Sequence, residues 1–268
     1  MNKLKNKLMR KKTSTWILPL LIVCFTITSC SAKEKELSYK EISTIDTDSI
    51  PLNIQSKIEE GLNKTFMKRN VKALDSVFSS IEKDKSPIAE YWKAYILYNK
   101  SIFYLSSRNK EKSEQALEEG IKLLKEASKS SESYALLGTM QNFSIQFKNG
   151  ITAGILGSKA KKNFEKALKL EPNNLRAYLG LATLDYYTPE KYGGRKEAAK
   201  YIEKALACPD KPLPSPVLPS WGRKSCYEII INFYIFKEDK VKAKKYYQEA
   251  IKLYPKDYQI SMLAKKLI

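Results

Sequence analysis

The sequence predicts an all-α protein built from repeated helix pairs, and three observations carry this prediction. From Pro51 onward apolar residues recur every three or four positions, without the alternation of a half-buried β-strand. The interruptions fall at Asn, Gly and Pro, residues that commonly end helices. One spacing pattern of small and large apolar residues also occurs three times in the second half of the chain. Such self-similarity is typical of a repeat architecture.

The first 29 residues have the pattern of an export signal. Residues 1–12 carry six basic side chains and no acidic one, and an uncharged apolar stretch follows from Trp16 to about Thr28. A basic segment followed by a short apolar stretch is typical of a secretory signal peptide. A membrane-spanning helix needs about twenty apolar residues, so an uncleaved anchor helix is the less favoured alternative.

The signal ends in Ile27-Thr28-Ser29-Cys30, which resembles the lipobox of bacterial lipoproteins. The resemblance implies that the Cys30 sulfur receives a diacylglycerol, that the chain is cleaved after Ser29, and that the new amine is acylated. Several acyl chains anchor a protein stably, whereas a single chain binds a membrane only marginally. Residue 31 is Ser rather than Asp, so the resemblance gives no sign of inner-membrane retention. We therefore expect a lipoprotein anchored in the cell envelope, in the outer membrane.

Three regions follow the predicted cleavage site. Residues 30–50 hold the lipidated cysteine and a polar tether, whose flexible span is about 25 Å. Residues 51–88 are predicted to form an N-terminal helix pair, at about 53–68 and 71–82, that serves as a cap or a degenerate repeat. Residues 89–268 contain the repeat array.

The repeated pattern places small residues where two helices approach closely and large ones in the gaps between them. The three segments are Ala160-x3-Phe164-x2-Ala167, Ala198-x3-Ile202-x2-Ala205 and Ala243-x3-Tyr247-x2-Ala250. Each follows a helical segment with a tyrosine anchor: Tyr134, Tyr178 or Tyr227. This pattern resembles the tetratricopeptide repeat (TPR), a helix–turn–helix unit of 34 residues. The resemblance implies a right-handed α-solenoid of about four to five helix pairs, with a C-terminal capping helix at 256–267.

Three segments interrupt the regular repeat. Residues 188–194 are predicted to form a turn, and the glycine-rich residues 148–157 a long inter-helix loop. The apolar part of that loop, 151–156, is expected to be buried in the groove or to form a contact site. Residues 209–221 contain five prolines and must be extended. We favour a spacer held down by Val217, Leu218 and Trp221 over a ligand motif.

Catalytic and metal-binding patterns are scarce. The chain has no histidine, which removes histidine-dependent triads, histidine bases and most zinc sites. It also lacks Cys-x-x-Cys and the phosphate-binding Gly-x4-Gly-Lys-[Ser/Thr] motif. Asp185, Tyr186, Tyr187 and Glu190 are interpreted as packing and solvation rather than an acid–base cluster. We therefore expect no enzyme activity, no cofactor and no metal.

The strong positive charge raises the possibility of nucleic-acid binding. Loss of residues 1–29 removes six charges from the formal +19 and leaves a chain near +13. The excess is almost all lysine, with five arginines after residue 29, and arginine is the residue suited to bidentate phosphate and base recognition. Export also leaves no evident nucleic acid to meet. We expect no nucleic-acid partner.

Two cysteines remain in the predicted mature chain besides Cys30. Cys208 and Cys226 flank the proline-rich segment, in a compartment that permits disulfides. Their separation does not follow from the sequence, so a disulfide and simple apolar packing both stay open.

In TPR proteins the first helix of each pair lines a groove that binds partners. Transferring the inward-facing consensus positions by resemblance gives a mixed aromatic and polar set: Tyr95, Tyr98, Ile102, Thr139, Asn142, Phe143, Arg176, Thr183, Tyr186, Tyr187, Glu228 and Asn232. Aromatic residues with amide partners suit peptide contact. The alternative is that several of them pack against neighbouring helices. A lysine–asparagine clamp for a C-terminal carboxylate is disfavoured, because no lysine accompanies Asn232 at the inward positions.

The leading functional hypothesis is a membrane-anchored scaffold that binds a protein or peptide partner in the cell envelope. The alternative is an accessory subunit for small-molecule transport. Residues 192–198, Tyr-Gly-Gly-Arg-Lys-Glu-Ala, followed by Ala205, are similar to a turn in the TPR component of some periplasmic TRAP-type transporters. An enclosed, ligand-sized pocket beside residues 150–157 would favour that alternative.

Overall fold

The computed structural model describes residues 36–37, 50–127, 129–209 and 215–267. The predicted signal peptide, the lipidation site Cys30 and most of the tether lie outside the described residues. The unit Glu34–Ile268 is compact and contains all of the elements below. Within the part of the chain that the structure describes, no helix is both long and apolar enough to cross a membrane.

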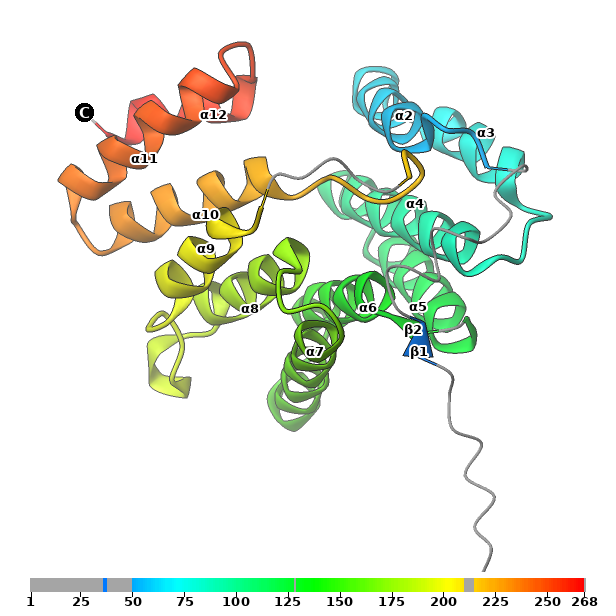
Figure 1. The fold of residues 1–268 in the computed structure, drawn as a ribbon, viewed down its shortest axis with the longest axis horizontal. Helices are drawn as coiled ribbons and strands as arrows, with labels where there is room; N and C mark the ends of the chain where they lie inside the picture. The colour runs from blue at the N-terminus through cyan, green and yellow to red at the C-terminus, as the bar shows by residue number, and fades with distance from the viewer. Residues whose placement is uncertain (1–35, 38–49, 128, 210–214, 268) are drawn as a thin grey trace, which may run out of the picture. The chain divides into compact units, whose positions relative to one another are not determined.

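The described helices follow one another as antiparallel pairs (Figure 1). Their bounds are α2 Ile54–Lys68 and α3 Lys72–Ile81, α4 Pro87–Ser106 and α5 Lys110–Glu126, α6 Ser131–Ser144 and α7 Gly150–Leu170, α8 Leu175–Tyr187 and α9 Ala198–Ala207, and α10 Arg223–Phe236 and α11 Lys240–Leu253. Helix α12 (Tyr258–Leu263) and the 3-10 turn η3 (Ala264–Lys266) follow. The remaining elements are the 3-10 turns η1 (Ile145–Phe147) and η2 (Glu190–Tyr192), and a short parallel pair of strands, β1 (Glu36–Leu37) and β2 (Lys129–Ser130).

Side-chain caps fix where many of these helices begin. A capping oxygen accepts a hydrogen bond from a backbone N–H of the first turn, which has no partner within the helix. Helix α4 begins with Ser86 as its cap and Pro87 at the first helical position, where proline is favoured. The other side-chain caps are Asn109, Ser130, Asn174, Asp239 and Asp257.

The positions of the repeat pattern form the contacts between paired helices. The alanines of all three segments are fully buried, and so are Phe164 and Ile202. The upstream pair α4 and α5 uses serines instead: Ser101 Oγ lies 2.9 Å from Ser113 Oγ, and both side chains are buried. The TPR-type α-solenoid predicted from the sequence is the fold that the structure shows.

Two large apolar clusters divide the described core. One is built on α2 to α6 and includes Trp92, Val217 and Leu218. The other is built on α8 to α12 and includes both remaining cysteines. Trp221 is partly buried and packs against both clusters. The connection between α9 and α10 therefore joins the two ends of the repeat array.

The prediction of a long loop at residues 148–157 is wrong. Helix α7 begins at Gly150 and continues without a break to Leu170. Each interior glycine costs a helix only about 1 kcal/mol relative to alanine, whereas every added residue contributes a backbone hydrogen bond. Ile151 and Ile155 are 84% and 49% exposed, so this apolar segment is not buried in a groove.

Cys208 and Cys226 are free thiols in the structure, and both are buried. The Cys208 thiol donates to the Lys204 carbonyl oxygen at 3.3 Å. Burial is the main reason that the pKa of the Cys226 thiol is raised to about 12. Because the thiolate is the reactive form, Cys226 is held as an unreactive apolar side chain.

The close packing of Phe164 predicts opposite effects of two glycine substitutions. A Cβ on Gly180 would lie 2.1 Å from Phe164 Cε1, while a Cβ on Gly154 would meet nothing within 4 Å. We expect Gly180→Ala to lower the free energy of unfolding by about 1–2 kcal/mol, because overpacking outweighs the gain in helix propensity. Gly154→Ala should raise it by up to about 1 kcal/mol. Urea unfolding followed by circular dichroism measures both, and equal effects would contradict the packing at Phe164.

Candidate partner-binding site

The first helices of successive pairs lie against one another. Helix α4 contacts α6, α6 contacts α8, and α8 contacts α10. We call the surface that these four helices share the inner surface. All twelve groove residues predicted from the sequence lie on these four helices.

Aromatic side chains from α4, α6, η1 and α8 form two contact sets, one of three rings and one of two. We call the five rings together the aromatic row: Tyr98, Phe143, Phe147, Tyr186 and Tyr187. Tyr98 meets Phe143 edge-on with ring centroids 5.5 Å apart, and Phe143 meets Phe147 at 6.2 Å. Tyr186 and Tyr187 contact each other at 4.9 Å. All five rings keep part of their surface exposed, and Tyr187 is 65% exposed.

Two tyrosines of the row, Tyr98 and Tyr186, are kept neutral at physiological pH by burial. Burial raises the pKa of Tyr98 to about 12, with a smaller contribution from the nearby Tyr187 hydroxyl. Burial likewise raises the pKa of Tyr186. The row therefore offers apolar ring surface together with uncharged hydroxyl groups.

The polar groove residues differ in how much hydrogen-bonding capacity they keep. Thr139 and Thr183 donate their hydroxyls to carbonyl oxygens of their own helices, one turn earlier. Asn232 donates to the Glu228 carbonyl oxygen and accepts from Lys266 Nζ at 3.0 Å. Asn142 is half-buried beside Phe143, and its amide makes no hydrogen bond within the described residues. Asn142 is thus the amide with the most capacity left for a partner.

Arg176 is committed to a buried ion pair rather than to an open groove. Its Nε and Nη2 atoms donate to the Glu132 carboxylate at 2.5 and 2.7 Å. Arg176 is 8% exposed and Glu132 is 3% exposed. Asn174 Nδ2 also donates to Glu132 Oε1, at 3.0 Å. Such bidentate, charge-assisted geometry fixes both side chains.

Glu228 lies at the other end of the inner surface. It is half-buried, and burial raises the pKa of its carboxyl. Lys224 Nζ is 3.8 Å from Glu228 Oε1 and donates at 2.8 Å to Asp257, which caps α12. Glu228 therefore belongs to the junction of α10 with the capping helix.

Residues 215–222, which we call the strap, cover another part of the inner surface. The Trp221 ring stacks on Tyr95 with centroids 5.0 Å apart, and its indole Nε1 donates to the Tyr91 hydroxyl at 2.9 Å. Arg176 Nη1 donates to the Trp221 carbonyl oxygen at 2.9 Å. Tyr95 is therefore a packing surface for the strap. The spacer interpretation of this segment agrees with the burial of Val217 and Leu218.

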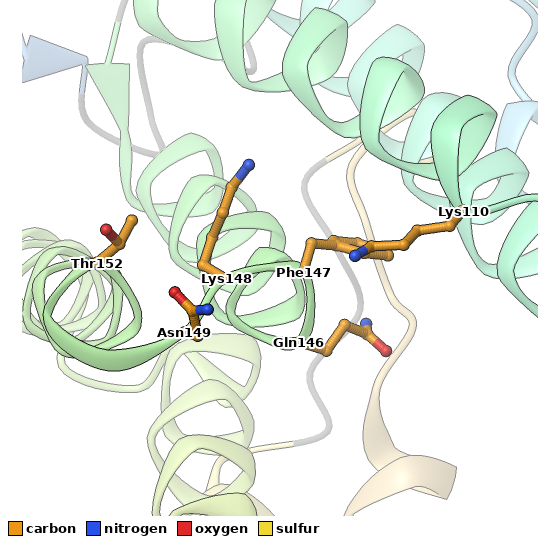
Figure 2. A pocket seen from close by; sticks show the side chains of 6 residues that line it. All are labelled: Lys110, Gln146, Phe147, Lys148, Asn149 and Thr152. Carbon is orange, nitrogen blue, oxygen red and sulfur yellow. The ribbon is translucent and has the colours of Figure 1, made fainter.

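Two pockets lie beside the start of α7. One, of about 360 Å³, is lined by Lys110, Gln146, Phe147, Lys148, Asn149 and Thr152. Figure 2 shows the Lys110 side chain running alongside the Phe147 ring, with Nζ 5.9 Å from the ring centroid. The other, of about 310 Å³, shares Lys148, which pairs with Glu114. Because Lys148, Asn149 and Thr152 are exposed, the first pocket is open to solvent.

The acidic residues near the end of α8 have structural partners. Asp185 Oδ2 accepts hydrogen bonds from the backbone N–H groups of Glu197 and Ala198, at 3.0 and 2.8 Å. It thus caps α9 from the preceding helix. Glu190 pairs with Lys237 at 2.9 Å, which lowers the pKa of its carboxyl. Among the described residues, no group of three or more Cys, Asp or Glu side chains is placed to hold a metal ion.

Sequence reasoning missed two important residues of this surface, Phe147 and Glu132. Phe147 belongs to a 3-10 turn rather than to a repeat helix, and Glu132 resembles any acidic residue in the first turn of a helix. The available signals were Arg176 in a lysine-rich chain and Trp221 after a proline-rich segment. Neither signal identifies its partner, since the contacts span 44 and 130 residues of sequence.

Comparisons with known proteins agree with the fold. A family model described as the tetratricopeptide repeat matches residues 232–257. The structure of TTC0263, a thermophilic TPR protein of Thermus thermophilus, is similar with a TM-score of 0.54 and 15% identity, over 80% of this chain and 98% of that chain. No curated protein sequence matches significantly. The chain therefore has the TPR-type α-solenoid fold.

Two further solved structures show weaker similarity. The HusA haemophore from Porphyromonas gingivalis has a TM-score of 0.43 at 20% identity, over 73% of this chain and 90% of that chain. The pilF protein of Pseudomonas aeruginosa has a TM-score of 0.34 at 16% identity, over 80% of this chain and 97% of that chain.

The buried Glu132–Arg176 pair predicts an asymmetric response to substitution. Glu132→Ala leaves the Arg176 guanidinium buried without its counter-charge, so we expect the free energy of unfolding to fall by about 3–5 kcal/mol. Glu60→Ala removes an exposed pair with Lys64 and should change stability little. Chemical denaturation of both variants measures the difference. Similar small losses in both would show that the Glu132–Arg176 pair is not buried in solution.

Proposed function

We propose that this protein is a lipid-anchored TPR scaffold of the cell envelope that binds a protein or peptide partner on its inner surface. The observation that carries the proposal is the aromatic row, five partly exposed rings on neighbouring helices of a TPR fold. TPR proteins generally act through protein contacts rather than catalysis, and solenoids use extended surfaces of this kind for binding.

The chemistry of the row suits a peptide chain. Tyrosine and phenylalanine supply large, rigid contact area, and aromatic residues are enriched where partners contribute most binding free energy. The uncommitted Asn142 amide can donate to and accept from a peptide backbone at the same time. Because the pKa values of Tyr98 and Tyr186 are raised by burial, these two hydroxyls are uncharged, and they can contribute hydrogen bonds beside the apolar ring surface.

The anchoring part of the proposal rests on the sequence. The basic segment, the apolar stretch and Ile27-Thr28-Ser29-Cys30 support export and lipidation at Cys30, in the outer membrane. A lipid anchor confines the scaffold to a surface, which raises its effective concentration toward partners on the same membrane.

The transport alternative has a specific requirement, an enclosed pocket beside residues 150–157. Both pockets there have exposed lining residues: Lys148, Asn149 and Thr152 in one, and Glu118, Lys125 and Lys159 in the other. Ligand sites for small molecules are usually concave and bury most of the ligand. We therefore keep the scaffold as the proposed function.

Partner binding should depend on the inner surface. We expect the triple variant Asn142→Ala, Tyr186→Ala, Asn232→Ala to recover at least about tenfold less partner, because contact hot spots each contribute about 2 kcal/mol or more. The measurement is cross-linking in whole cells, followed by purification through a C-terminal tag and quantitative mass spectrometry.

A matched control uses two asparagines and one tyrosine that are exposed and lie away from the inner surface: Asn63, Asn173 and Tyr258. The corresponding triple alanine variant should recover the partner as wild type does. Equal recovery by wild type and the inner-surface variant would argue against this binding site.

Membrane attachment should depend on Cys30. In Cys30→Ala cells we expect the protein to move from the membrane fraction to the soluble fraction, because the acyl chains supply the attachment. Labelling with a radioactive fatty acid should be lost in the same variant. Cys24→Ala, a substitution within the predicted signal, is the control and should leave both properties unchanged. Continued membrane attachment of Cys30→Ala would overturn the lipid anchor.

A further inference from the structure

The strap is an excursion of the chain between two helices whose ends are already held together. Arg223, the first residue of α10, donates to the carbonyl oxygens of Leu206 and Cys208 at the end of α9, at 3.0 and 2.9 Å. The chain nevertheless reaches α2 and α4 before it returns, as the segment leading into α10 shows in Figure 1. Closing the α9–α10 connection does not require these distant contacts.

Side chains of α2, α4 and α8 hold the strap backbone through hydrogen bonds. Within the strap, residues 215–218 form a turn in which the Leu218 N–H donates to the Ser215 carbonyl oxygen at 3.1 Å. Trp92 Nε1 donates to the Val217 carbonyl oxygen at 2.8 Å. Gln55 Oε1 accepts from the Ser220 N–H at 2.8 Å and from its hydroxyl at 3.1 Å. Arg176 Nη1 donates to the Trp221 carbonyl oxygen at 2.9 Å. Hydrogen bonds to the main chain hold a segment whatever its side chains are, while pockets for its side chains supply the specificity.

The side chains of the strap fill such pockets. Val217 and Leu218 are 1% and 2% exposed within the apolar cluster of α2 to α6, and Pro219 is also buried. The Trp221 ring lies between Tyr95 and Arg176, whose guanidinium carbon is 5.8 Å from the ring centroid. The bound part of the strap, residues 217–221, therefore consists of two apolar residues, a proline, a small residue and a tryptophan.

We propose that this part of the inner surface is a peptide-binding site that the strap occupies in cis. The partner it fits is a segment of the same chemistry, with two adjacent apolar residues at the end of a turn, followed by proline and, two positions later, tryptophan. The inference rests on the proposed function in requiring a peptide partner on the inner surface. It goes further in naming the partner's chemistry and a built-in competitor.

Covalent connection gives the strap a large advantage over a free peptide. A tethered segment acts at an effective concentration in the millimolar range, so a peptide that makes equivalent contacts binds wild type weakly. Weakening the strap removes the competitor and leaves the surface intact. Trp221→Ala does this by deleting the ring that stacks on Tyr95 and bonds to Tyr91. Gly222→Ala provides another route, because Gly222 has φ +116° and a Cβ there would lie 2.8 Å from Leu175 Cδ2.

The test is a titration of the full chain, purified in mild detergent, with a fluorescein-labelled peptide that copies residues 216–222. Fluorescence anisotropy is measured for wild type, Trp221→Ala and Gly222→Ala. We expect both variants to bind the peptide at least about tenfold more tightly than wild type. A peptide with alanine in place of its tryptophan should bind at least about tenfold more weakly, and adding Tyr95→Ala to Trp221→Ala should abolish binding.

A control separates release of the strap from general loosening of the fold. Leu263→Ala destabilises the buried contact of α12 in the other cluster without touching the strap, and it should bind the peptide no better than wild type. Circular dichroism and thermal melting show whether each variant keeps its fold.

Three results would overturn the inference. One is equal peptide binding by wild type and the strap variants, and another is no binding by folded strap variants. The third is unfolding of both strap variants, because the strap would then be an indispensable core segment rather than a displaceable occupant. Loss of partner recovery in the Asn142, Tyr186 and Asn232 variant, together with any of these results, would leave the proposed function standing without this site.

Discussion

The Glu132–Arg176 ion pair is the contact on which the arrangement of the inner surface depends. Removing two charges from water costs several kcal/mol per ion, so a buried pair persists only when its remaining hydrogen-bonding groups are also satisfied. Here Asn174 donates a further hydrogen bond to the Glu132 carboxylate. The Arg176 guanidinium donates a further hydrogen bond to the Trp221 carbonyl oxygen. The pair therefore fixes α6, the start of α8 and the end of the strap relative to one another.

The inner surface therefore has two parts that differ in how accessible they are to a binding partner. The strap covers the first part, where it contacts Tyr91, Tyr95 and Arg176. Its Trp221 side chain packs against both apolar clusters. Along the aromatic row the rings pack edge-on and keep exposed surface. A partner meets the row directly, whereas it meets the other part only by replacing the strap.

The differences between expectation and structure come from contacts that are distant in sequence. The glycine-rich segment resembled a loop because glycine disfavours helices locally, yet α7 extends through it from a well-packed core at Ala160 and Phe164. Asp185 resembled several other surface acids, and it caps α9 across a turn. Local propensity is a weak preference that tertiary packing overrides. Of the predicted groove residues, Tyr98, Phe143, Tyr186 and Tyr187 belong to the aromatic row, while Arg176 and Tyr95 are taken up by internal contacts.

The fold follows from the sequence without further information, since the spacing of alanines and large residues at Ala160, Ala198 and Ala243 reflects the distance between paired helices. The caps Ser86, Asn174 and Asp239 act within one turn of their helices, so these helix starts depend on local sequence. Which inward-facing residues stay accessible is settled only when the chain is folded. That choice depends on Trp92 meeting Val217 and on Trp221 meeting Tyr91, contacts more than a hundred residues apart, and periodicity within a repeat carries no information about them.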